Sequence, residues 1–325
     1  MKAVNKKGFE FSFGWIFALI FGGIIIFLAI YMAFNIVSGE RRASDSGLAK
    51  SFDTLLYPIG TGLESNKVTQ ITFPVETMIS FQCSSDTGFG EQIIRTSSSS
   101  SLGSKYSENP ISVRSKDKYI FSDPKVEGKT FLTFVKPLDM PFEVADMIYF
   151  IPTTEKYCFV ISKSSTIGKE LDGLKNNNYQ FNKTIFIEDL KNCPQDSKKI
   201  CFNMGNTRDC HASISGDRIS KGNKNVYFDG GENGNALLYA AIFSEPEYYE
   251  CQLKRLNKRA SELAKLYLQK QQMSPAGCGQ GVETELEAYA NLTASFNSSE
   301  SSLSNILSIS KNLGGRNDRL SCPLF

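Results

Sequence analysis

The sequence contains very little of what catalytic and metal sites are usually built from. Among its 325 residues there is one histidine, His211, and one tryptophan, and its eight cysteines include no C-x-x-C pair. A zinc site needs several Cys or His ligands at short spacing, so none is predicted. A phosphate-binding loop of the G-x-x-x-x-G-K type is also missing. The sequence therefore predicts no catalytic residue, no metal and no cofactor.

Charge and composition exclude two further classes. The chain has 36 basic and 34 acidic residues without a long block of either sign, so a nucleic-acid partner is not predicted. Its 24 phenylalanines and 41% hydrophobic content exclude wholesale disorder. The acidic, glycine-rich segment 229–234 lacks the alternating ligands of a calcium loop and is interpreted as a tight turn. Cys210 and His211 would point to opposite faces of a strand, which argues against a Cys/His nucleophile.

One long apolar run organises the chain. Trp15 to Val37 has a single polar side chain, Asn35, and a helix of 23 residues is about 34 Å long, enough to span a bilayer. Basic residues lie on both sides of it, so the flanking charges favour a cytoplasmic N-terminus only slightly. Small residues four apart within the run would let two such helices approach closely and self-associate, although small residues are common in membrane helices; they are Ala18, Gly22, Ala29 and Ala33.

The residues ahead of this run resemble a class III, prepilin-type signal. Lys6-Lys7-Gly8 directly precedes Phe9 and the apolar helix, and in type IV pilins the peptidase cuts after such a glycine. The bacterial pattern has glutamate at the fifth position after the cut, where this chain has Phe13. The resemblance implies processing between Gly8 and Phe9, but this departure favours the other interpretation, a plain signal anchor with a basic N-terminal tail.

Cysteines and glycosylation acceptors predict where the rest of the chain lies. An even number of cysteines without metal-type spacing favours a disulfide framework, which requires an oxidising compartment. Three N-x-S/T acceptors, at Asn182, Asn291 and Asn297, point to the same side of the membrane. We therefore expect an extracytoplasmic domain with disulfides among Cys83, Cys158, Cys193, Cys201, Cys210, Cys251, Cys278 and Cys322.

Residues 67–232 have the pattern of a β-rich domain. Short β-branched and aromatic segments separated by Gly, Ser, Asp and Pro predict a mixed sheet rich in antiparallel strands. Within it, residues 157–187 read as a strand, a helix and a strand.

Residues 233–325 have helical periodicity. A short apolar helix is predicted from Ala236 to Phe243, and Ser244-Glu-Pro-Glu247 has the features of a helix start. Two apolar stripes of similar length follow, separated by a loop at residues 273–280, and predict an antiparallel hairpin along its full extent. Such a hairpin would bring Cys251 next to Cys322, the preferred disulfide.

Several segments together resemble a group of uncharacterised, N-terminally anchored proteins of small-genome archaea of the DPANN type. These are KKGFEFSFGWIFALI, FPVET, FGEQIIR, YIFSDPKVEGK, KPLDMPFEVAD, LLYAAIFSEPEYYECQLKRL and SCPLF. The group has no known activity, so the resemblance implies location and architecture alone.

The sequence thus predicts an α+β, single-pass membrane protein. Its parts would be a cytoplasmic tail (1–13), a membrane helix (14–37), a juxtamembrane helix or linker (38–66), a β-rich ectodomain (67–232) and a helical hairpin (233–325). The favoured function is a structural or interaction role in the cell envelope, with the lipid bilayer and a surface protein or glycan as partners. A pilin-like subunit is the first alternative, and an extracytoplasmic hydrolase using an Asp/Glu pair is the second.

Overall fold

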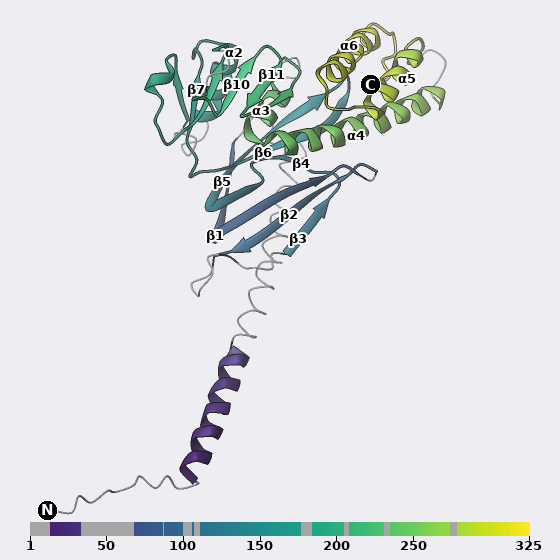
Figure 1. The fold of residues 1–325 in the computed structure, drawn as a ribbon. Helices are drawn as coiled ribbons and strands as arrows, with labels where there is room; N and C mark the ends of the chain where they lie inside the picture. The colour runs from purple at the N-terminus through teal and green to yellow at the C-terminus, as the bar shows by residue number, and fades with distance from the viewer. Residues whose placement is uncertain are drawn as a thin grey trace, which may run out of the picture.

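The computed structural model describes residues 14–33, 68–86, 88–99, 106, 111–176, 184–204, 208–230, 235–273 and 278–325. Over these ranges the domain is α+β, as predicted, but its strands form two sheets where the sequence suggests one (Figure 1). The first sheet has the order β3-β2-β1-β5-β6-β4, and only its β4–β6 pair is parallel. Its strands are β1 (Thr69–Ser84), β2 (Glu91–Ser98), β3 (Ile111–Ser115), β4 (Tyr119–Phe121), β5 (Lys125–Asp139) and β6 (Glu143–Pro152).

The second sheet has the order β12-β11-β10-β9-β7-β8 and is parallel in its middle. Helix α2 (Thr166–Asn176) connects the parallel strands β7 and β8, which confirms the predicted strand, helix and strand. The sequence does not predict β3 or β11. The strands are β7 (Tyr157–Val160), β8 (Thr184–Ile187), β9 (Lys198–Phe202), β10 (Ala212–Ser215), β11 (Arg218–Lys221) and β12 (Lys224–Tyr227).

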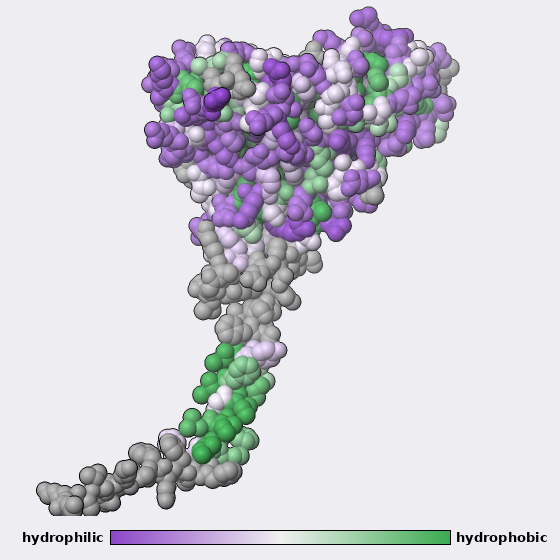
Figure 2. Space-filling view, in the orientation of Figure 1, coloured by the Kyte–Doolittle hydropathy of each residue, from purple (hydrophilic) through white to green (hydrophobic). Residues whose placement is uncertain are grey.

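The N-terminal helix runs from Gly14 to Ala33 and is long and apolar enough to cross a membrane. None of its most apolar window is buried, and Figure 2 shows apolar side chains along it while the surface of the domain is mostly hydrophilic. Residues 34–37 of the predicted span lie outside the described residues, as do the predicted tail and juxtamembrane segment.

Helix α3 (Ala236–Phe243) is buried along its whole length, which explains why it contains no charged residue. It contacts β4, β5 and β6 of the first sheet, and the Phe243 ring lies 5.3 Å from that of Tyr157 on β7. On β11, Lys221 donates hydrogen bonds of 2.7 Å to the carbonyls of Ile242 and Ser244 at the end of the helix. Those carbonyls have no partner within a helix, so the buried lysine satisfies them and ties the two sheets together.

The predicted full-length helical hairpin is wrong in its second half. Helix α4 (Pro246–Met273) begins and ends as predicted, but the second stripe forms two helices, α5 (Glu283–Ala294) and α6 (Glu300–Asn317). Ser298 has a φ of 65°, and the Ser299 hydroxyl accepts a hydrogen bond from the Ser302 amide, so a new helix starts there. An apolar stripe does not show this break because both helices bury the same kind of side chain.

The break also changes the disulfide pattern. Helix α5 packs antiparallel on the second half of α4, and α6 packs on α5, so the end of α6 returns to the start of α5. Cys322 is therefore bonded to Cys278, and Cys251 is bonded to Cys83 on β1, so the preferred pair Cys251–Cys322 is wrong. The other two bonds are Cys158–Cys193 and Cys201–Cys210, and all eight cysteines are paired as predicted.

Helix α4 is attached to the first sheet by a buried polar network. Arg255 has no exposed surface and donates to the carbonyls of Lys116 and Lys118 at 3.1 and 3.0 Å. Its guanidinium also lies 4.6 Å from the centre of the Tyr119 ring. A buried guanidinium is stable only when its donors are satisfied, so this contact determines which turn of α4 meets the sheet.

Candidate functional site

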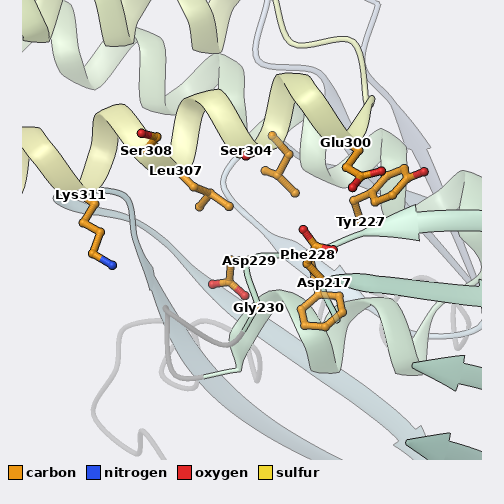
Figure 3. A pocket seen from close by; sticks show the side chains of 11 residues that line it. Asp217, Tyr227, Phe228, Asp229, Gly230, Glu300, Ser304, Leu307, Ser308 and Lys311 are labelled. Atoms are coloured by element: carbon orange, nitrogen blue, oxygen red, sulfur yellow. The ribbon is translucent and has the colours of Figure 1, made fainter. Parts of the chain in front are cut away.

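Two adjoining cavities follow one side of helix α6. The first, of about 330 Å³, lies between α6 and the end of the second sheet, and the other, of about 410 Å³, lies between α6 and the β5–β6 turn. Leu307 and Lys311 line both, so the two form one groove, here called the α6 groove. Figure 3 shows the first cavity, with Glu300, Leu307 and Lys311 on the helix and Asp217 and Asp229 on the opposite wall.

Local geometry places the acidic side chains. Gly216, with a φ of 62°, forms the tight turn between β10 and β11 and projects Asp217 into the groove. The amide of Phe228 donates to the carbonyl of Asp217 at 2.8 Å, which holds the turn against the end of β12. Glu300 is in the first turn of α6, where a negative charge stabilises the helix.

Acidic residues dominate the lining of the groove. Asp217, Asp229 and Glu300 line the first cavity, and Asp139 and Asp318 line the second. Among the described residues, Lys311 is the only basic side chain that lines either cavity. Leu303, Leu307, Tyr227 and Phe228 add an apolar surface. Such a groove suits a ligand that carries positive charge on an apolar stem, or one rich in hydroxyl donors.

A further carboxyl, that of Asp146 on β6, has a raised pKa. Burial, together with the nearby charges of Glu143 and Asp139, raises the pKa of Asp146 to about 6. Asp139 is itself part of the lining, at the end of β5. Burial is the main cause of the raised pKa, and repulsion by the two neighbouring carboxylates adds to it.

No family model, no curated protein and no solved structure matches this chain. The resemblance to archaeal surface proteins therefore stays a prediction.

The predicted glycosylation acceptors lie in three different situations. Asn291 is exposed on α5, and Asn297 is exposed in the turn before α6. The side-chain Oδ1 of Asn297 accepts a hydrogen bond from the Ser299 backbone amide at 3.1 Å. Asn182 lies outside the described residues, as do Gly8 and Phe9 of the predicted processing site. Both described acceptors are thus on the surface, where a glycan would not disturb the core.

The described part of the chain contains no group of three His, Cys, Asp or Glu side chains that could hold a metal ion. Asp229, which opens the acidic glycine-rich segment, instead lines the α6 groove, and residues 231–234 lie outside the described ranges. Cys210 is bonded to Cys201, and burial together with Lys221 and Lys198 lowers the pKa of His211 to about 4. The neighbouring cysteine and histidine therefore form no nucleophile pair.

A second polar cluster is not predicted from the sequence. Lys136 on β5 contacts the carboxylate of Glu170 on α2, and Glu170 also accepts hydrogen bonds from Asn235 and Tyr239. The sequence does contain one signal that Lys136 is buried. Phe134 and Lys136 are two residues apart, so they lie on the same inward face of β5. The partners of that lysine come from distant parts of the chain, and no local pattern indicates them.

Proposed function

We propose that this chain is a single-pass membrane protein that displays a disulfide-bonded α+β domain outside the cytoplasm, with a structural or interaction role in the cell envelope. The pairing of all eight cysteines in the domain that follows an exposed apolar helix carries this proposal. Disulfides persist in oxidising compartments and are rare in the cytosol. An exposed apolar helix of 20 residues is stable in lipid and would aggregate in water.

Single added cysteines test the topology. In intact cells, a membrane-impermeant maleimide should label a Ser46→Cys variant, whereas an Ala3→Cys variant should react only after permeabilisation. The native cysteines are bonded and give no background, and the unsubstituted protein is the control. Labelling of the Ala3 variant alone in intact cells would reverse the proposed orientation. Protection of both variants would place the domain in a closed compartment.

The α6 groove is the surface through which we expect the interaction. Five carboxylates and one lysine line it, so electrostatic complementarity favours a partner segment with Lys or Arg side chains. A labelled oligolysine peptide is a suitable probe in fluorescence anisotropy at low salt. Surface charges contribute about 0.5–1 kcal/mol each, so Asp217→Asn with Glu300→Gln should weaken binding about five- to thirty-fold.

Glu262→Gln is the matched control for that experiment. Glu262 is an exposed carboxylate on α4 that pairs with Lys265 and lies away from the groove's lining. Its substitution should leave the affinity within two-fold. Equal loss with both sets of variants would show nonspecific attraction and remove the groove from the proposal.

A pilin-like subunit is a second candidate function, and the N-terminal helix favours it. A shallow cavity of about 390 Å³ on this helix is lined by Ala18, Gly22 and Gly23 among larger apolar residues. A side-chain carbon at either glycine would meet no atom within 4 Å, so this surface can accept a neighbouring helix closely. N-terminal sequencing of the mature protein tests this function. Pilin-like processing predicts a mature chain that starts at Phe9, and an intact Met1 would contradict it.

A further inference from the structure

A buried lysine and a buried asparagine share the partly exposed carboxylate of Glu170. Lys136 is 7% exposed, and its Nζ contacts Oε1 of Glu170. The other oxygen, Oε2, accepts a hydrogen bond of 2.9 Å from Nδ2 of Asn235, which is 9% exposed. A primary amine and a primary amide from distant parts of the chain therefore meet on the two oxygens of a single acid.

Aromatic residues surround this meeting point. The Tyr239 hydroxyl donates to Oε2 of Glu170 at 2.9 Å, and its ring centre lies 5.4 Å from Nζ of Lys136. Behind it, the rings of Phe134 and Tyr149 each lie 6.2 Å from that of Tyr239. The aromatic rings therefore enclose the Lys136 side of the ion pair, while the Glu170 side chain stays 26% exposed.

The backbone of Asn235 has a constrained conformation. It has a φ of 63°, an uncommon conformation for a residue other than glycine, directly before the buried helix α3. Lys136 is also constrained, because β5 pairs with β6 at this point and Lys136 lies opposite Met147. Holding two reacting groups at a fixed separation removes much of the entropic barrier to their reaction.

From these contacts we propose that Lys136 and Asn235 form an intramolecular isopeptide bond, with Glu170 as the catalytic acid and base. Glu170 takes a proton from the ammonium of Lys136, and the resulting amine attacks Cγ of Asn235. The new Nζ–Cγ bond forms as the Cγ–Nδ2 bond breaks. Nζ loses two protons in all, and the leaving Nδ2 gains both of them, with Glu170 carrying protons between the two nitrogens. Nδ2 therefore leaves as an ammonium ion. The overall reaction converts an ammonium and a primary amide into a secondary amide and an ammonium ion, without any oxidant.

The bond would be a fifth covalent cross-link, and it would resist reduction. It would join β5 of the first sheet to the start of α3. Glu170 on α2 contacts both of the joined residues. Disulfides in the second sheet act locally, whereas this amide would close a loop of about 100 residues, for which chain entropy predicts a large stabilisation.

Peptide mapping of the full-length protein extracted in detergent tests the proposal. After reduction and proteolysis, tandem mass spectrometry should find a branched peptide that joins Lys136 to Asn235, lighter by one ammonia than its two parts. Lys136→Arg and Glu170→Gln should both abolish the branched peptide and restore the missing ammonia.

Lys198→Arg is the matched control. Lys198 also contacts two carboxylates, those of Asp123 and Glu155, at the edge between the sheets. Its substitution should leave the branched peptide intact. If the variants fail to fold, the peptide map of the unsubstituted protein by itself shows whether the Lys136–Asn235 bond is present. Separate, unmodified peptides containing Lys136 and Asn235 would overturn the proposal. A linear Asn235 peptide that has lost ammonia would also overturn it, because that peptide is the product of succinimide formation.

Discussion

The two sheets of the domain achieve their stability by different means. In the first sheet, β1 has 16 residues and β5 has 15, and side chains on both faces are buried in hydrophobic clusters. In the second sheet no strand exceeds five residues, and one face packs on the main core while the other carries a small cluster built around cysteines. The bonds Cys158–Cys193 and Cys201–Cys210 lie in that cluster.

The difference shows how disulfide bonds can supply stability where little hydrophobic surface is buried. Short strands bury little surface, and a small cluster such as that of the second sheet gives a correspondingly small hydrophobic stabilisation. Disulfides compensate by restricting the unfolded chain. The first sheet has extensive aromatic packing and a single disulfide, Cys83–Cys251, which attaches the end of β1 to α4.

Removal of disulfides should give the largest effect and tests this comparison directly. Cys83 and Cys251 are 168 residues apart, and chain entropy predicts a loss of about 5 kcal/mol for their double substitution to serine. Cys201 and Cys210 are 9 apart, and the same model predicts about 2.5 kcal/mol. Urea unfolding of both double variants measures these values. A larger loss for Cys201 and Cys210 would show that the second sheet depends on its disulfides beyond the chain entropy.

Truncation of a core aromatic residue should be nearly as damaging in the first sheet. Phe134 is 1% exposed and stacks on Tyr149 at 4.5 Å, so Phe134→Ala should cost about 3–5 kcal/mol through the cavity it leaves. Phe89 is 43% exposed, and Phe89→Ala is the matched control, with an expected change within about 0.5 kcal/mol. Equal effects would mean that the aromatic core is not the source of the sheet's stability.

A smaller effect, of opposite sign, is expected at Asp146 on β6. Its pKa of about 6 lies above the ordinary 3.8, so the folded state binds this proton more tightly than the unfolded state does. Stability should therefore fall as the pH rises from 3.8 to 6. Asp146→Asn should stabilise the protein by about 1 kcal/mol at pH 7, since partial exposure reduces the effect, and should have no effect near pH 3.5.

Unfolding curves at the two pH values measure this prediction. Glu143→Gln serves as the control, because removing one neighbouring charge should give a smaller gain with the same pH dependence. A stabilisation by Asp146→Asn that is the same at both pH values would come from packing and would contradict the electrostatic explanation.

Local patterns were informative wherever the structure depends on neighbouring residues. The start of α4 follows from Ser244, Pro246 and Glu247, and the unit β7-α2-β8 follows from a change of period along the chain. The same kind of pattern failed at Ser298, because two successive helices can share one apolar stripe. A reversal of the chain by a single residue with positive φ leaves little trace in hydrophobic periodicity.

The sequence by itself determined the apolar helix, the α+β class, most of the strands and the presence of a disulfide framework, since each rests on residue type or spacing within a short window. The tertiary structure alone decided which cysteines meet, where the α6 groove forms and that Lys136, Glu170 and Asn235 come together. Those contacts join segments far apart in the chain. They depend on how the two sheets and the helices pack against one another, and alternation along a strand shows which face a side chain takes but not what lies opposite.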